Sequence, residues 1–319
     1  LLRRRIRDPR FSMELYGVGR RSRSDVAICY ISDSVDQSVL NRMRKLIQSI
    51  DVDALTMNIE SLAECMFTHK WINPFPKFKY SERPDTATAA ILDGNIVIMV
   101  DNSPAVMIIP ASIFDIIEEA DDFNFSPMIG SYLRITRFFF SIVTWILTPL
   151  WLLFVNNPDW VPEFMKFVLI TDDITVPVLL QLLILELAVD GLKLAAVNTP
   201  TMLSTPLSIV AGIVVGEYAV SSGWFNPEAL LYMAVVTVGT YGQTNFEMGY
   251  AFKFLRVLTL ILTQIFNLGG FIAGVVISVL MIAFNRTITG KSYIYPLIPW
   301  DGKMLKRKVF RVRLPHSYK

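Results

Sequence analysis

The pattern of apolar and polar residues changes once along this chain, near Ile135. Before that point short apolar stretches alternate with charged residues, and after it long apolar runs follow one another. About 20 apolar residues are enough to cross a bilayer. The pattern therefore predicts a mixed α/β cytoplasmic domain, a polytopic α-helical membrane domain of five or six hydrophobic segments, and a basic cytoplasmic tail, at residues 1–125, 126–285 and 286–319.

The first region has the periodicities of a globular α/β or α+β domain. Val26, Ile28 and Tyr30 alternate with other residues, as a half-buried strand requires. Pro84 fits the first turn of a helix, and Asp93-Gly94 is a turn signal. We expect strands at residues 12–18, 25–31, 96–100 and 105–109, and helices at 37–50 (with Ser34 as a capping signal), 59–67, 84–92 and 112–120. Neither a GxGxxG nor a GxxxxGK[ST] nucleotide loop occurs.

The second region contains five apolar runs. They cover residues 138–155, 176–198, 203–220, 229–242 and 254–284. The last run is longer than one crossing needs, and Asn267-Leu268-Gly269-Gly270 interrupts it. A break at Gly269-Gly270 into two short or re-entrant helices would give six segments. As an alternative, the run is one tilted helix and the segment at 203–220 does not cross fully.

Charge in the connecting segments sets the predicted orientation. Residues 286–319 contain nine Lys and Arg and the single acid Asp301, whereas the loop at 156–175 is acidic. Positive charge marks the cytoplasmic side, which Lys253 and Arg256 also indicate, so the tail and the Arg-rich first domain lie inside and the number of crossings is even. The basic tail could also attract anionic lipid head groups, although an orientation signal is the favoured interpretation.

One predicted membrane helix, at 176–198, carries three ionisable residues in its interior. Glu186, Asp190 and Lys193 are spaced by four and three, which places them on one helical face. Ionisable groups within a membrane span are costly and usually face a bundle interior or a water-filled path. The stripe is therefore a candidate ion pathway. In the competing interpretation, Asp190 and Lys193 neutralise one another as a structural pair.

The next segment has one face almost without side chains. Ser204, Ser208, Gly212 and Gly216 recur every fourth residue, and Glu217 lies beside them. Small residues at this spacing let another backbone approach closely. The face either lines a pore or serves plain helix packing, and packing is the commoner use of the motif.

Composition excludes several function classes. The chain is 53% hydrophobic with a mean hydropathy of +0.45, which is too apolar for an ordinary soluble protein, and its net charge of +2 indicates no nucleic-acid partner. Two histidines and two dispersed cysteines offer no catalytic triad and no metal cluster, so we expect no enzyme activity, metal or cofactor. The opening Leu-Leu-Arg-Arg-Arg lacks a Met and a signal peptide, and we expect an N-terminally truncated domain.

Several stretches carry a family resemblance. The run Asn73 to Pro110 contains Glu82-Arg83-Pro84-Asp85, and LTPLWLLFV at 147–155 and YPLIPW at 295–300 follow later. Together they resemble the A-subunit type of the GerA family of spore germination proteins. The resemblance implies a multi-pass protein of the spore inner membrane that works with other germination proteins. It also implies oligomers, with pentamers favoured, that release monovalent cations from the spore core.

Within that family, the DNSPAVMI stretch and the chain's ending resemble one branch more closely than the nutrient-sensing receptors. That resemblance implies a chain that amplifies germination and does not recognise the germinant. Two other functions stay open. The chain would be a non-conducting scaffold if its soluble domain only recruits partners, or a secondary transporter acting as a monomer. Internal duplication would favour a transporter, and the two halves show no convincing repeat.

Overall fold

The computed structural model describes residues 1–66, 73–198, 212–288, 290 and 292–312. It forms two compact units, Leu1–Arg134 together with Met281–Lys319, and Ile135–Leu280. The predicted basic tail at 286–319 lies in the same unit as the first domain. The reason lies in its contacts: the backbone N–H of Ile113 donates to the Tyr293 carbonyl at 3.0 Å, and Ile288 is part of the domain's core.

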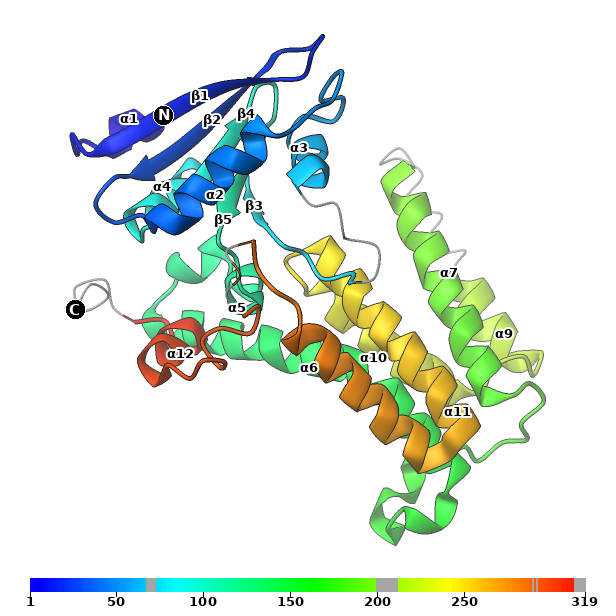
Figure 1. Ribbon diagram of the computed structural model, residues 1–319. Helices are drawn as coiled ribbons and strands as arrows, with labels where there is room; N and C mark the ends of the chain where they lie inside the picture. Colours follow the sequence, from blue (N-terminus) through cyan, green and yellow to red (C-terminus); the bar gives the residue numbers. More distant parts are fainter. Residues whose placement is uncertain (67–72, 199–211, 289, 291, 313–319) are drawn as a thin grey trace. The chain divides into compact units, whose positions relative to one another are not determined.

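The first unit is built on a five-stranded antiparallel sheet (Figure 1). Its strands lie in the order β1-β2-β4-β5-β3. Their bounds are Phe11–Val18 (β1), Ser24–Ile31 (β2), Lys79–Ser81 (β3), Ile96–Val100 (β4) and Val106–Ile109 (β5). The two predicted hairpins are confirmed, whereas the short edge strand β3 was not predicted.

Helices cover both faces of this sheet. Helices α2 (Gln37–Gln48) and α3 (Asn58–Met66) pack on one face, and α1 (Leu2–Arg5) and α4 (Pro84–Leu92) pack on the other. Ile28 of β2 contacts the first layer and Cys29 the second, and both are fully buried. The half-buried strand expected here is therefore wrong, because α4 covers the face that the alternation assigned to solvent.

Helix boundaries in this unit follow local capping chemistry. Asp36, and not Ser34, caps α2 by accepting from the Ser38 N–H at 3.0 Å. The helix α5 (Ile113–Ile117) begins with a Ser112 capping box and ends three residues earlier than expected, before the 3₁₀ turn η1 (Ala120–Phe123). Two helices were not predicted from the sequence, the short α1 and the tail helix α12 (Gly302–Val309).

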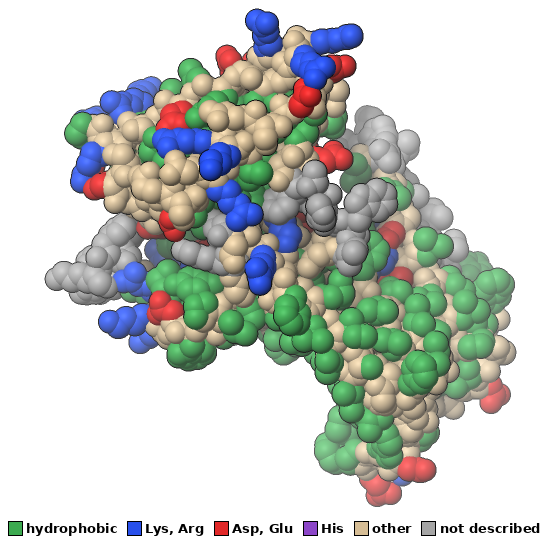
Figure 2. Space-filling model, viewed as in Figure 1, with side chains coloured by type: hydrophobic (Ala, Val, Ile, Leu, Met, Phe, Trp, Pro, Cys, Tyr) green, Lys and Arg blue, Asp and Glu red, His purple; other side chains and the backbone are tan. Residues whose placement is uncertain are grey.

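The second unit is helical. It is made mostly of α6 (Pro127–Asn156), α7 (Val178–Asn198), α10 (Pro227–Tyr241) and α11 (Phe246–Ala283), with the short turns η2 (Pro158–Trp160) and η3 (Glu163–Val168) after α6, and the π-helical turn η4 (Gly212–Tyr218) and α9 (Ala219–Ser221) before α10. Two of the described helices, α6 and α11, are long and apolar enough to cross a membrane. Figure 2 shows hydrophobic side chains over much of the visible surface of this unit.

The last apolar run folds back on itself. Asn267 has φ 52° and ψ −130°, which no helix interior allows, and Figure 1 shows the two arms of α11 side by side. A Cβ on Gly270 would lie 1.8 Å from the Leu262 carbonyl oxygen, and one on Gly274 would lie 2.8 Å from the Thr259 side chain. The predicted break is confirmed, with its turn at Asn267, and glycines let the returning arm pack closely.

Candidate transport site in the helical unit

A buried ion pair lies near mid-length of two helices. Glu186 is close to the centre of α7, and Arg256 is close to the centre of the first arm of α11. The Arg256 Nε donates to Glu186 Oε1 at 2.5 Å, and the two residues are only 3% and 4% exposed. Charges at this depth in apolar helices require a partner, because desolvating a lone ion costs several kcal/mol.

A second basic residue extends the pair into a cluster. Lys253, one turn before Arg256, forms an ion pair with Asp190, donates to the Glu186 carbonyl at 3.1 Å and lies 3.6 Å from Glu186 Oε2. Arg256 Nη1 also donates to the backbone carbonyl of Thr144 on α6 at 2.5 Å. The cluster therefore ties α6, α7 and α11 together.

Sequence reasoning found the two acids of this cluster and missed its two bases. Lys253 and Arg256 were interpreted as markers of the inner surface, whereas the structure buries them against α7. The signal was available: two basic residues three positions apart face two acids four positions apart. Asp190 forms its ion pair with Lys253 on α11, and the alternative interpretation, in which Asp190 pairs with Lys193, does not describe the pair that forms.

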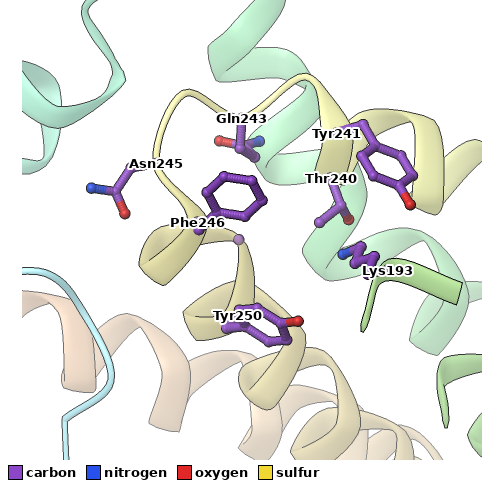
Figure 3. Close-up of a pocket in the computed structure, with 8 residues that line it drawn as sticks. Lys193, Thr240, Tyr241, Gln243, Asn245, Phe246 and Tyr250 are labelled. Atoms are coloured by element: carbon purple, nitrogen blue, oxygen red, sulfur yellow. The ribbon is translucent and has the colours of Figure 1, made fainter. Parts of the chain in front are cut away.

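Lys193 occupies a different setting at the end of the stripe. Its Nζ lies 5.2 Å from the ring centroid of Tyr241 and 5.4 Å from that of Tyr250. These distances fit cation–π contacts. Lys193 also reaches into a cavity of about 60 Å³ (Figure 3). Its other lining residues come from the end of α10, the following turn and the start of α11, and are Thr240, Tyr241, Gln243, Asn245, Phe246, Gly249 and Tyr250.

The cavity gives the polar stripe an opening. A site needs only about 10–15 Å³ of such volume to hold a water, so this one accommodates several. Exposure of the side chain rises along α7 from 5% at Glu186 to 24% at Asp190. The three residues of the stripe therefore form a polar track that runs from a sealed ion pair toward a cavity whose lining includes hydroxyl and amide side chains.

The small-residue face is described only in part. Ser204 and Ser208 lie outside the described residues, as do both histidines, His69 and His316. Gly212 and Gly216 are in η4, and an added Cβ on either would meet nothing within 4 Å. Glu217 beside them is exposed. Within one chain this face has no packing partner among the described residues, and its role in a pore stays a prediction.

The motif Glu82 to Asp85 has a structural role in the first unit. Pro84 begins α4, and Arg83 pairs with Asp85 at 2.9 Å and with Asp121, a few residues before α6. Its hydrogen bond to Arg83 lowers the pKa of Asp85 to about 2, so the carboxylate stays charged. Glu82 is exposed. The motif thus connects the sheet domain to the segment that leads into α6.

A buried charge network lies beside this connection. Lys79 of β3 donates to the carbonyls of Asp115 and Glu118, each at 2.7 Å, and burial lowers the pKa of Lys79. Burial alone would raise the pKa of Asp115, but Lys308 of α12 outweighs it and leaves that pKa lowered. Arg134 of α6, 1% exposed, pairs with Glu118 at 2.8 Å. The network joins the sheet, α5, α12 and the start of α6.

The model of the family described as Bacillus/Clostridium GerA spore germination protein matches residues 1–319. The chain belongs to the GerA family. The expected family resemblance is confirmed over the whole sequence.

Similar GerA proteins cover the chain almost completely. It is 37% identical over 315 residues to Stage V sporulation protein AF of Bacillus subtilis (strain 168), and 27% identical over 322 residues to Spore germination protein GerLA of Bacillus cereus. Each match covers 99% of this chain and 64% of the relative, so the chain spans about two thirds of their length. The crystal structure of the N-terminal domain of the A subunit of the Bacillus megaterium spore germinant receptor GerK3 matches 34% of this chain and 83% of its own, with 31% identity and a TM-score of 0.26.

Proposed function

We propose that this GerA-family chain is a multi-pass subunit of the bacterial spore inner membrane that assembles into an ion channel during germination. It moves monovalent cations out of the spore core, carries out no enzymatic reaction and acts with other germination proteins. Its relatives are named for sporulation and spore germination, which supports the setting. The sheet domain and the tail face the core side.

Membrane insertion is supported by what the apolar helices leave uncovered. Only 17% of the most apolar window of α11 is buried, whereas the core helix of a soluble protein would be mostly buried. On α7, Leu187 is 73% exposed and Leu194 is 61% exposed. Lipid would cover these side chains. Because the arms of α11 are antiparallel, both of its ends lie on one side, as an even number of crossings requires.

The observation that carries the proposal is the cluster of charges at mid-helix. Two acids and two bases near the centres of α7 and of the first arm of α11 would lie near the middle of a bilayer. Such groups are rare there and typically mark ion pathways. Because Glu186 and Arg256 are sealed within one chain, water would reach this level between copies, next to Asp190, Lys193 and the open face of Gly212 and Gly216.

Ion flux from liposomes tests the proposal. The purified chain is reconstituted with trapped potassium, and Glu186→Gln, Asp190→Asn and Lys193→Gln are compared with Glu163→Gln. Glu163 is 94% exposed in the loop after α6 and serves as a matched loss of one carboxylate. We expect flux in the parent and the control, and altered flux in the stripe variants with assembly intact. No flux from correctly inserted oligomers would refute the channel.

A scaffold is the second candidate, and one observation favours it. The two most central charges, Glu186 and Arg256, neutralise each other in a sealed contact that braces three helices. A brace needs no water path. Oligomers that stay silent across ions and potentials, yet capture other germination proteins through the sheet domain, would support the scaffold. A monomer by mass measurement that exchanges ions would instead indicate a secondary transporter.

A further inference from the structure

The tail helix α12 is fixed to the first turns of α6. The backbone N–H of Arg311, just after α12, donates to Ser131 Oγ at 3.0 Å. Arg134 Nη1 donates to the carbonyls of Arg307 and Lys308 at 3.1 and 3.0 Å, and so satisfies the C-terminal end of α12. All these groups belong to the first unit. Wherever the start of α6 lies, α12 lies beside it.

The start of α6 lies outside the hydrocarbon if α6 crosses a bilayer. At 1.5 Å per residue its 30 residues span about 45 Å, against about 30 Å of hydrocarbon. No charged residue occurs between Arg137 and Asn156, and that stretch is about 27 Å long. The excess length therefore precedes Arg137. Ser131 and Arg134, which hold α12, come at the level of the lipid head groups.

Large apolar side chains are exposed around this attachment. Trp300, just before α12, is 71% exposed, and Phe310, just after it, is 46% exposed. On the adjoining segment Phe123, Phe125 and Tyr132 are 47%, 49% and 68% exposed. These five side chains, called the aromatic cluster below, flank the two segments that meet where α12 is attached to α6. Exposed large apolar side chains gathered in one region often mark an interaction or membrane surface. Trp and Tyr with a polar edge are typical of the membrane interface.

Basic residues are interleaved with this aromatic cluster. Lys303 and Lys306 on α12 are exposed, and neither forms an ion pair with a carboxylate among the described residues. Arg311 donates to the Phe123 carbonyl at 3.0 Å, and its guanidinium lies 5.5 Å from the Phe123 ring centroid. Lys308, by contrast, is engaged with Asp115. The exposed charge of α12 is thus positive, apart from the capping Asp301.

We propose that α12 and the aromatic cluster around it form an interfacial binding surface for anionic lipid head groups. The aromatic side chains enter the head-group region, and Lys303 and Lys306 pair with lipid phosphates. Lipid is favoured over an acidic protein because the surface is attached to a membrane helix at head-group depth. The inference rests on the membrane placement of α6 proposed above and does not depend on conduction.

A fluorophore at the surface tests this. Met128 is 85% exposed beside the aromatic cluster, and a Met128→Cys variant in a Cys65→Ser background carries an environment-sensitive dye. The full chain is reconstituted in phosphatidylcholine nanodiscs containing increasing phosphatidylglycerol. We expect a blue shift that saturates with phosphatidylglycerol and weakens in 1 M salt, because salt screens the attraction.

Two variants decide the outcome. Lys303→Gln/Lys306→Gln should weaken the apparent affinity for phosphatidylglycerol by about 25-fold, since each lysine near the surface contributes about fivefold. Arg4→Gln/Arg5→Gln, the matched control, removes two exposed charges from α1 and should leave the response unchanged. An equal loss in both variants, or no response to phosphatidylglycerol, overturns the surface. So does a dye response only to an acidic peptide added in detergent.

The same samples separate this inference from the proposed channel. Ion flux is measured in liposomes of the same composition. A lipid response without flux refutes the channel and retains the surface, whereas flux with no lipid response does the reverse.

Discussion

The Glu186–Arg256 pair is expected to stabilise the helical unit cooperatively. Glu186→Gln removes the negative charge that compensates the buried Arg256 guanidinium, although the Gln amide oxygen and the Thr144 carbonyl can still accept hydrogen bonds from it. Breaking one side of a buried ion pair typically costs about 3–5 kcal/mol. Arg256→Gln should lose less electrostatic stabilisation than Glu186→Gln, because the Glu186 carboxylate still has the Lys253 ammonium at 3.6 Å.

The double variant Glu186→Gln/Arg256→Gln removes both charges. It leaves no uncompensated ion, so its total cost should be well below the sum of the two single variants. We expect a coupling energy of about 2 kcal/mol or more. Glu163→Gln breaks a pair with Lys166 in which the two side chains are 94% and 59% exposed, and should cost less than about 1 kcal/mol.

Unfolding by SDS in mixed micelles measures these differences. The fluorescence of Trp145 and Trp151, both buried in the helical unit, is a suitable signal. Additive costs, with a coupling energy under about 0.5 kcal/mol, would mean that the two charges do not depend on each other. The mid-helix cluster would then lose its role as a brace, and a water-exposed pair would become the better description.

Three further predictions concern the hairpin and the sheet domain. Gly270→Ala should destabilise α11 by about 1–3 kcal/mol, because its Cβ would overlap the Leu262 carbonyl. Gly269→Ala is the control, since a Cβ there would meet nothing within 4 Å. Equal midpoints of thermal unfolding in detergent would contradict the close packing of the two arms of α11. Burial raises the pKa of the Cys29 thiol to about 11. At pH 8 a thiol reagent should therefore label the half-buried Cys65 of α3 before it labels Cys29. Equal labelling rates of the two cysteines would contradict the burial of Cys29. The hydrogen bond from Arg44 lowers the pKa of Glu14 to about 2. The contribution of this carboxylate to stability is therefore present above about pH 4.5 and is lost as the pH falls toward 2. In urea unfolding, the free energy of unfolding should fall less between pH 7 and pH 3 for Arg44→Gln than for the parent.

Much of the sheet domain could be predicted because its elements carry local signals. The helix beginning at Pro84 and the turn at Asp93-Gly94, which joins α4 to β4, follow from turn and capping chemistry in the sequence. The prediction that failed there was the burial of only one face of β2. Cys29 and Ile31 alternate with Val26 and Ile28, yet both sets are buried, because α4, which lies more than 50 residues later in the chain, covers the second face.

The sequence predicted the acidic residues of the candidate site but not their basic partners. A helical repeat of 3.6 residues put Glu186, Asp190 and Lys193 on one face, and α7 keeps them there. The partners Lys253 and Arg256 could not be assigned, because pairing depends on which helix packs against α7 and at what level. Local spacing contains no information on that contact.

The sequence by itself determined the apolar runs, the position of their charges and the break near Asn267. Each of these depends on neighbouring residues, through helical period, hydropathy and the freedom of Asn and Gly to leave the helix. Only the tertiary structure decided that Arg256 seals Glu186 and that the tail helix attaches to the start of α6. Those contacts join groups 70 and about 180 residues apart, and only the folded chain brings such distant groups within hydrogen-bond distance.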